Sequence, residues 1–246
     1  MKAGILGGTL DPIHNGHIEI ALKAMEVLGL DAVALMPSGD PPHKPRVTDK
    51  RDRLAMVRLA AETHPGLYAS DVEINREGRT YTVDTLSALS VEQPDVKWTY
   101  IIGADTLNTL DSWREFPRVA RLCDFAVINR PGCDVELAKL RAQSITACFG
   151  TKVTMLPLSG PALSSTRLRG QVAAGEDIGA YVPAAVAEYI REREERKAKR
   201  RAKAKKDLDD HLAHIRMEMA LSENYALELD EFEFLVYLMD EAVRVA

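Results

Sequence analysis

The sequence predicts an α/β fold: a doubly wound parallel sheet with a C-terminal helical extension. Short apolar runs, rich in β-branched residues, alternate with helical patterns through residues 1–190. These runs are apolar on both faces, which is typical of parallel strands that helices cover on both sides of a sheet. Beyond residue 190 the chain becomes strongly charged while its apolar residues keep a helical spacing. Ligands of such a sheet are expected at the carboxyl ends of the strands.

Six short segments are candidate strands, and helical patterns separate them. The candidate strands are 2–6, 31–36, 68–74, 98–103, 124–129 and 152–157. The segments 16–28 and 49–63 are two of the candidate helices, and in the second Leu54, Val57 and Ala61 recur at helical spacing. No internal repeat is visible, so the alternation predicts one doubly wound sheet.

The composition is that of an ordinary globular protein, with 46% hydrophobic and 28% charged residues among 246. No apolar run approaches the roughly 20 residues that a membrane helix needs, so no membrane partner is expected. Asp11 and His14 would interrupt the apolar region of a secretory signal. The 3 cysteines form no CxxC pair and are interpreted as reduced thiols rather than a disulfide framework or a zinc site. The sequence thus predicts a cytoplasmic protein.

Charge is distributed unevenly along this chain, whose formal net charge is −5. Residues 191–206 carry 10 Lys or Arg against 3 Glu, whereas residues 207–246 carry 11 Asp or Glu against 2 Arg. The predicted division is therefore a body of residues 1–192 and an extension of residues 193–246, in which a basic linker helix precedes acidic amphipathic helices. The first of these helices is expected to begin at Pro183 and to continue into the basic run. Two apolar stripes follow at helical spacing: Leu208, Leu212, Ile215 and Met219, then Phe232, Leu235, Val236, Met239 and Val243.

The stretch GGTLDPIHNGH, residues 7–17, joins the first predicted strand to the first predicted helix. It fits neither GxGxxG nor a Walker A loop, because its glycines are spaced differently and no GK[ST] follows. Gly7 and Gly8 would nevertheless let backbone N–H groups approach an anion, and the positive end of the helix would point to the same place. This corner is therefore a candidate phosphate site.

His14 and His17 are three residues apart, so they share a face if both lie in the first helical turn. Each imidazole would donate a hydrogen bond to phosphoryl oxygens, and protonation of at least one would stabilise negative charge in a transition state. The structural alternative is that one histidine packs while the other caps the helix. Their place in a glycine-rich corner favours the functional interpretation.

The corner resembles the signature of the HxGH nucleotidyltransferases, in the GGTxDPxHxGH form of the bacterial nicotinate-nucleotide adenylyltransferases, with Leu10 in place of Phe. About 150 residues later, LSSTRLR is similar to the family motif ISSTxxR, whose hydroxyls and arginine suit a triphosphate. The resemblance covers residues 1 to about 192 and implies a Rossmann-like nucleotidyltransferase fold. It implies that His14, His17 and Arg169 are catalytic. The ATP-binding residues that it implies are Gly7, Gly8, Thr9, His17, Asp105, Arg130, Ser164, Ser165, Thr166 and Arg169.

Two further segments resemble family motifs for the second substrate. PSGDPPHK, residues 37–44, implies that Lys44 and His43 hold the substrate phosphate, whereas the alternative is an exposed loop with an incidental lysine. REGRTYTVDTL, residues 76–86, implies that Thr82 and Asp84 line a pyridine site, where backbone amides would hold a carboxylate. A helix start capped by Thr80 or Thr82, with Asp84 in its first turn, would explain the same residues.

The segment IIGADTLNTLDSWREF, residues 101–116, is similar to the family pattern GxDxxxxxxxW. The resemblance implies that Asp105 accepts a hydrogen bond from a ribose hydroxyl and that Trp113 stacks on the pyridine ring. Trp98, which lies inside a predicted strand, is expected in the core. Arg130, in VINRPG, is implied on the adenine side.

The reaction that the resemblance implies joins ATP and nicotinate mononucleotide into nicotinate adenine dinucleotide and pyrophosphate. Mg²⁺ is expected bound to ATP, because no carboxylate cluster resembles a protein cage for it. Two related adenylyltransferase activities remain as alternatives, with nicotinamide mononucleotide or phosphopantetheine as the acceptor. A different class of alternative is a nucleotide-binding regulator whose basic segment, 196–206, binds RNA.

A nucleic-acid partner is not the expectation for the extension, since aromatic residues do not interleave its basic run and an acidic segment follows it. Its apolar stripes need burial, either on the body or on another subunit. A homo-oligomer formed through the C-terminal helices is therefore the expectation.

Overall fold

The computed structural model describes residues 1–40, 47–129, 133–159 and 163–221. Contacts divide the chain into two units, Met1–Ala187 and Glu188–Ala246. The predicted boundary at residue 192 stays a prediction, because this division by contacts does not test where a domain of independent function ends.

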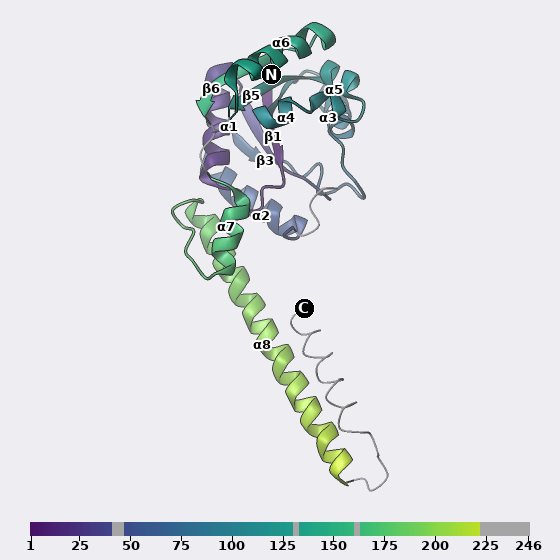
Figure 1. Cartoon of the computed structure of the whole chain (residues 1–246), viewed down its shortest axis with the longest axis vertical. Helices are drawn as coiled ribbons and strands as arrows, with labels where there is room; N and C mark the ends of the chain where they lie inside the picture. The colour runs from purple at the N-terminus through teal and green to yellow at the C-terminus, as the bar shows by residue number, and fades with distance from the viewer. Residues whose placement is uncertain (41–46, 130–132, 160–162, 222–246) are drawn as a thin grey trace. The chain divides into compact units, whose positions relative to one another are not determined.

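The first unit is built on six parallel strands in the order β3-β2-β1-β4-β5-β6. Among them, Figure 1 labels β1, β3, β5 and β6. The strands are β1 (Lys2–Gly8), β2 (Ala32–Pro37), β3 (Leu67–Ala69), β4 (Lys97–Gly103), β5 (Cys123–Asn129) and β6 (Val153–Ser159). This order confirms the doubly wound sheet. The strand order reverses between β1 and β4, and ligands of such sheets bind beyond the carboxyl ends of the strands at that point.

Helices connect the strands and begin where the sequence supplies suitable caps. Asp49 and Asp134 accept hydrogen bonds from the first-turn amides of α2 and α6, at 2.8 and 3.1 Å. Gly29 and Gly150 end α1 and α6 in the left-handed conformation that glycine adopts without strain. The helices are α1 (Asn15–Leu28), α2 (Lys50–Glu62), α3 (Thr82–Glu92), α4 (Ala104–Leu107), the 3₁₀ turn η1 (Leu110–Ser112), α5 (Phe116–Leu122), α6 (Val135–Phe149), α7 (Ser165–Ala173) and α8 (Ala184–Leu221).

The predicted strand 68–74 was too long, because β3 ends at Ala69. Ser70 still donates to the carbonyl of Leu35, at 3.0 Å, but the chain then turns and the amide of Asn75 donates to the carbonyl of Asp71. The alternating pattern in this segment therefore belongs partly to a turn, which buries Glu73 instead of extending the sheet.

The core lies on both faces of the sheet, as the apolar runs predicted. On one face Ile5, Phe125 and Val127 are at most 1% exposed, and Leu86 of α3 is fully buried in the same cluster. On the other face, at alternate strand positions, Leu35 and Ile101 are at most 2% exposed. Trp98 is 4% exposed and belongs to this cluster, which confirms its expected place in the core.

The described part of the second unit, residues 188–221, is helical. It belongs to α8, which begins directly after Pro183 within the first unit and continues through the whole basic segment. Ion pairs within the helix, such as Lys197–Glu194 at 2.8 Å and Arg196–Glu192 at 3.5 Å, lie on its exposed surface and add little stability each. Leu208 and Leu212 are buried members of the first apolar stripe. The second stripe lies outside the described residues. Within the described part of the chain, no helix has the length and apolar character needed to cross a membrane.

Candidate active site

The first feature of the site is a pair of stacked imidazoles at the start of α1. The ring centroids of His14 and His17 lie 3.6 Å apart and the rings are inclined by 19°. His14 is the N-cap residue of the helix and His17 is its third residue. His14 is buried, whereas His17 is half-buried. The expectation that the two histidines share one face of the first turn is confirmed.

A hydrogen bond decides which nitrogen of His17 carries the proton. The backbone N–H of His14 donates to Nδ1 of His17 at 3.2 Å. A ring nitrogen accepts only when it is unprotonated, so the proton of His17 lies on Nε2 and the ring is neutral in this arrangement. His17 also caps the helix, so the structural and functional interpretations are compatible.

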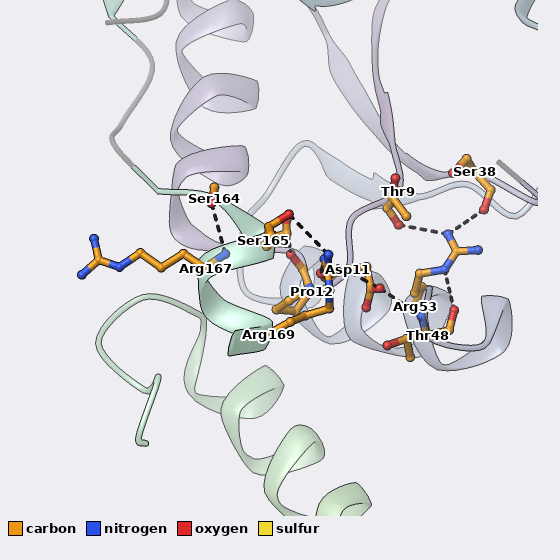
Figure 2. Close-up of polar contacts among 11 residues, drawn as sticks. Thr9, Asp11, Pro12, Ser38, Thr48, Arg53, Ser164, Ser165, Arg167 and Arg169 are labelled. Carbon is orange, nitrogen blue, oxygen red and sulfur yellow. Dashed lines mark hydrogen bonds and ion pairs between the residues drawn. The ribbon is translucent and has the colours of Figure 1, made fainter. Parts of the chain in front are cut away.

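Helix α7 brings the second motif to this corner (Figure 2). Nη1 of Arg169 donates to the carbonyl of Asp11 at 2.6 Å, and the hydroxyl of Ser165 donates to the carbonyl of Pro12 at 3.0 Å. The Asp11–Pro12 peptide bond is cis. Two motifs that are distant in the sequence are thus joined directly. The two hydrogen bonds connect residues that are 153 and 158 positions apart.

The Arg169 guanidinium is held on one side and open on the other. Nη2 donates to the hydroxyl of Thr166 at 3.3 Å, and Nη1 lies 3.9 Å from the carboxylate of Asp11. The Arg169 side chain is nevertheless 37% exposed, so part of its fork of donors can reach an anion. Ser164 is the N-cap of α7 and accepts from the backbone of Arg167 at 3.2 Å, which leaves its O–H able to donate.

The segment predicted to line a pyridine site begins helix α3. This helix starts at Thr82 after the N-cap Tyr81, so neither Thr80 nor Thr82 is the N-cap, and that part of the structural alternative is wrong. Asp84 lies in the first turn, as expected, and is exposed. Thr82 is half-buried.

Tyr100, on β4, connects this segment to the glycine corner. Its ring meets Trp113 edge-on, with centroids 5.8 Å apart and an angle of 81°. Its hydroxyl lies against Gly7, where any side chain would overlap it. Burial raises the pKa of Tyr100 above its ordinary value, the negative charge of Glu73 raises it further, and a hydrogen bond with Thr82 opposes them. Tyr100 is therefore a neutral phenol that holds the two segments together.

Four other predicted residues have different outcomes. Asp105 is exposed in the first turn of α4, directly after the carboxyl end of β4, where a substrate hydroxyl could reach it. His43, Lys44 and Arg130 lie outside the described residues, so their predicted contacts stay predictions.

Two buried charged residues at the site were missed as candidates by the sequence analysis. Asp11 is 1% exposed and its carboxylate accepts from the backbone of Thr48 at 3.0 Å. Arg53 of α2 is also 1% exposed and donates only to backbone carbonyls. A signal for Arg53 was available, because its spacing from Met56 and Val57, i, i+3 and i+4, places it on the apolar face of the helix.

Comparison with known proteins now decides the family. The model of the cytidylyltransferase-like family matches residues 5–171. A "Probable nicotinate-nucleotide adenylyltransferase" of Synechococcus sp. (strain JA-3-3Ab) is 44% identical over 193 residues, which cover 78% of this chain and 92% of that protein. The chain belongs to the nicotinate-nucleotide adenylyltransferase family. A relative of the same name from Aeromonas salmonicida (strain A449) is 40% identical over 77% of this chain and 94% of its own length.

Solved structures resemble the adenylyltransferase fold of this chain. The Plasmodium falciparum nicotinic acid mononucleotide adenylyltransferase complexed with NaAD superposes with a TM-score of 0.63, covering 78% of this chain and 95% of that one. Sequence identity is 19%, so this likeness concerns the fold alone.

The packing of Gly7 under Tyr100 makes a testable prediction about stability. We expect Gly7→Ala to lower the free energy of unfolding by about 1–3 kcal/mol, because the new methyl group overlaps the Tyr100 hydroxyl. Tyr100→Phe removes that oxygen, so in a urea-denaturation double-mutant cycle the Gly7 substitution should cost less in the Phe background. Equal costs in both backgrounds would contradict the packing. Gly170→Ala, inside α7, is the control: its added Cβ meets open space, so this substitution should not lower the free energy of unfolding.

Proposed function

We propose that this chain transfers the adenylyl group of ATP to nicotinate mononucleotide, giving nicotinate adenine dinucleotide and pyrophosphate. An oxygen of the mononucleotide 5′-phosphate forms a bond to the α-phosphorus of ATP, and the bond from that phosphorus to the departing pyrophosphate breaks. The observation that carries the proposal is the hydrogen-bonded meeting of the histidine corner with α7. The names of the relatives at 44% and 40% identity support the same reaction.

This reaction requires the protein to position the two substrates and to stabilise charge at the reacting phosphorus, and it does not require a general base. The second pKa of a phosphate monoester is about 6, so the nucleophile is already anionic at pH 7. The acceleration then has two sources. The protein holds the two substrates in the reactive orientation, and it directs hydrogen-bond donors at the reacting phosphoryl group. The neutral His17 is suited to this task, because its Nε2–H is a donor whose direction the Nδ1 hydrogen bond holds fixed.

In this proposal His14 and His17 donate to the α-phosphate, and Arg169 stabilises the leaving pyrophosphate with its exposed donors. Ser164 and Thr166 add hydroxyl contacts to the β- and γ-phosphates at the start of α7, where Ser165, whose hydroxyl donates to the carbonyl of Pro12, contributes its backbone N–H. Backbone groups of Gly7, Gly8 and Thr9 line the phosphates, and Asp105 accepts from a ribose hydroxyl. Trp113, Thr82 and Asp84 border the pyridine ring. His43, Lys44 and Arg130 keep their predicted roles.

Magnesium enters this scheme as part of the ATP substrate. Across residues 1–40, 47–129, 133–159 and 163–221, no three His, Cys, Asp or Glu side chains gather to form a metal cage. Mg²⁺ prefers oxygen ligands, retains several waters and commonly binds substrate phosphates. We therefore assign the ion to the phosphate oxygens of ATP, where it neutralises charge on the leaving group.

The direct test is pyrophosphate release by the purified full chain with ATP and Mg²⁺. Nicotinate mononucleotide, nicotinamide mononucleotide and phosphopantetheine are compared in parallel. We expect fastest release with the acid, because a carboxylate gains charge-assisted hydrogen bonds that an amide does not. Faster release with either other acceptor would replace the proposed substrate. If folded protein releases none with all three, the RNA-binding interpretation of the basic segment becomes the candidate.

His17 offers a sharper test, because its two nitrogens have different tasks. His17→Asn keeps an acceptor near the Nδ1 position but loses the Nε2 donor, whereas His17→Ala loses both. We expect turnover to fall by about 10²–10³ in both variants, the loss typical of one preorganised donor. The melting temperature should fall more in the Ala variant, since only it leaves the His14 N–H unsatisfied. Turnover of His17→Ala within threefold of the wild type would contradict the assignment; His64→Asn, remote from both motifs in sequence, is the control.

We also propose that the extension assembles copies of the chain rather than taking part in catalysis. The family model ends at residue 171, and both relatives match less than four fifths of the chain. The second predicted apolar stripe is the kind of surface that helices bury against one another; its residues are Phe232, Leu235, Val236, Met239 and Val243.

A chain truncated after residue 192 tests this separation. We expect kcat/KM for both substrates to stay within about threefold of the full chain, because every residue with a proposed contact precedes the cut. Light scattering should give a smaller number of chains per particle for the truncated protein. An unchanged number would contradict assembly through the extension, and a large loss of kcat/KM would contradict its separation from catalysis.

A further inference from the structure

We infer that Arg53 is a positioning residue that ties the ATP corner to the loops of the second substrate, so that the binding of both substrates depends on it. The inference rests on the proposed function, because that function assigns a ligand to each of these loops. It concerns a residue that none of the family motifs quoted above contains.

The Arg53 side chain donates hydrogen bonds to four backbone carbonyls, and Figure 2 shows those of Thr9, Ser38 and Thr48. Nη1 donates to Thr9 at 2.9 Å and to Ser38 at 2.6 Å. Nη2 donates to Gly39 at 2.8 Å, and Nε donates to Thr48 at 3.0 Å. One guanidinium thus joins the turn after β1, the turn after β2 and the residues before α2.

Each of the joined segments adjoins a proposed ligand contact. Thr9 belongs to the glycine corner, two residues before Asp11, whose carbonyl receives Arg169. Ser38 and Gly39 precede, and Thr48 follows, the part of the sequence that contains His43 and Lys44. Asp11 makes a second connection between the glycine corner and the residues before α2, because its carboxylate accepts from the backbone of Thr48 at 3.0 Å. A shift of Arg53 would therefore move the corner and both flanks of that segment together.

The connection continues to the pyridine side through Gly39. A Cβ added at Gly39 would lie 2.5 Å from the carbonyl oxygen of Glu73, so these two backbones are in close contact. The Glu73 carboxylate accepts from the hydroxyl of Thr85, on α3, at 2.9 Å. Asp40, next to Gly39, forms an isolated parallel bridge with Arg79. The carbonyl that Arg53 holds at Gly39 thus sits against the turn that leads into α3.

Only arginine meets the geometric demand at this position. A guanidinium offers five N–H donors in a rigid planar fork, whereas lysine offers three donors from a single nitrogen and cannot reach carbonyls on several sides. Burial lowers the pKa of Arg53, and the negative charges of Asp11, Asp40, Asp49 and Glu73 oppose this effect. An arginine keeps its proton in such surroundings, so a buried cation with acidic neighbours holds the loops.

Arg53 acts through these loops and not on the substrates themselves. Its side chain is 1% exposed, so substrate atoms do not reach its donors. Because it supports segments on both substrates' sides, its loss should weaken both binding steps in parallel, in contrast to a residue that touches one ligand.

The test compares Arg53→Ala and Arg53→Lys with the wild type and with Arg58→Ala. Arg58 is a matched control, because it lies on the same helix but is exposed and pairs with the exposed Asp71 at 3.2 Å. KM and kcat are measured separately for ATP and nicotinate mononucleotide, at least 15 °C below each melting temperature, a margin of roughly four to seven times the shift that 1 kcal/mol produces in a domain of this size.

We expect KM for both substrates to rise about tenfold or more in Arg53→Ala, with kcat/KM falling about 10²-fold, since misplaced loops cost rate in that range. Arg53→Lys should recover part of the loss in KM because it keeps the charge and some of the donors. A purely structural role would lower the melting temperature and the active fraction, and thus apparent kcat, while both KM values stayed within twofold of the wild type. That result would overturn the inference, as would a rise in only one KM.

If Arg53→Ala does not fold, the same criteria apply to Arg53→Lys alone. If neither variant folds, Arg53 supports folding rather than position and the inference is wrong. Wild-type and Arg58→Ala protein must both release pyrophosphate with nicotinate mononucleotide. Failure of those two would count against the proposed function, whereas their activity alongside unchanged Arg53 variants would count against the inference alone.

Discussion

The turn between β1 and α1 has to find hydrogen-bond donors for carbonyls that neither the strand nor the helix can satisfy. Buried backbone carbonyls are rarely left without a partner, because the loss of solvation is costly. In this chain Arg53 of α2 donates to Thr9, while Arg169 and Ser165 of α7 donate to Asp11 and Pro12. These hydrogen bonds hold α2 and α7, which are distant in the sequence, at the carboxyl end of β1. The candidate site lies where the two helices meet this turn.

The same hydrogen bonds explain why the side chains of the candidate site are held in fixed orientations. Phosphoryl transfer to an anionic nucleophile needs fixed donors more than it needs a base. His17 is oriented by the amide of His14, and Arg169 by a backbone carbonyl, so in the proposed reaction neither side chain has to reorganise greatly when it binds phosphate. Tyr100, neutral in its buried place against Gly7, extends this rigidity toward Trp113 and the start of α3.

Local patterns were sufficient to predict most of the sheet and the two motifs that meet at its corner. Five of the six candidate strands match in place, and the motif residues meet in space as their resemblance implied. The strand at 68–74 was too long, because an alternating pattern does not distinguish an edge strand from a turn that buries Glu73. The proton of His17 could not be placed either, since only the His14 amide beside it makes Nδ1 an acceptor.

By itself the sequence determined the order of strands and helices, the glycine-rich corner after the first strand and the charged extension, because hydrophobic period, glycine content and charge are properties of neighbouring residues. The helical spacing of Arg53 placed it on an apolar face, but only the tertiary structure decided that its buried guanidinium donates to the backbone of three separate segments. The partners of a side chain come from other segments, here Thr9, Ser38, Gly39 and Thr48. Which carbonyls face a given guanidinium depends on how the strands pair and the helices pack, and no local pattern records it.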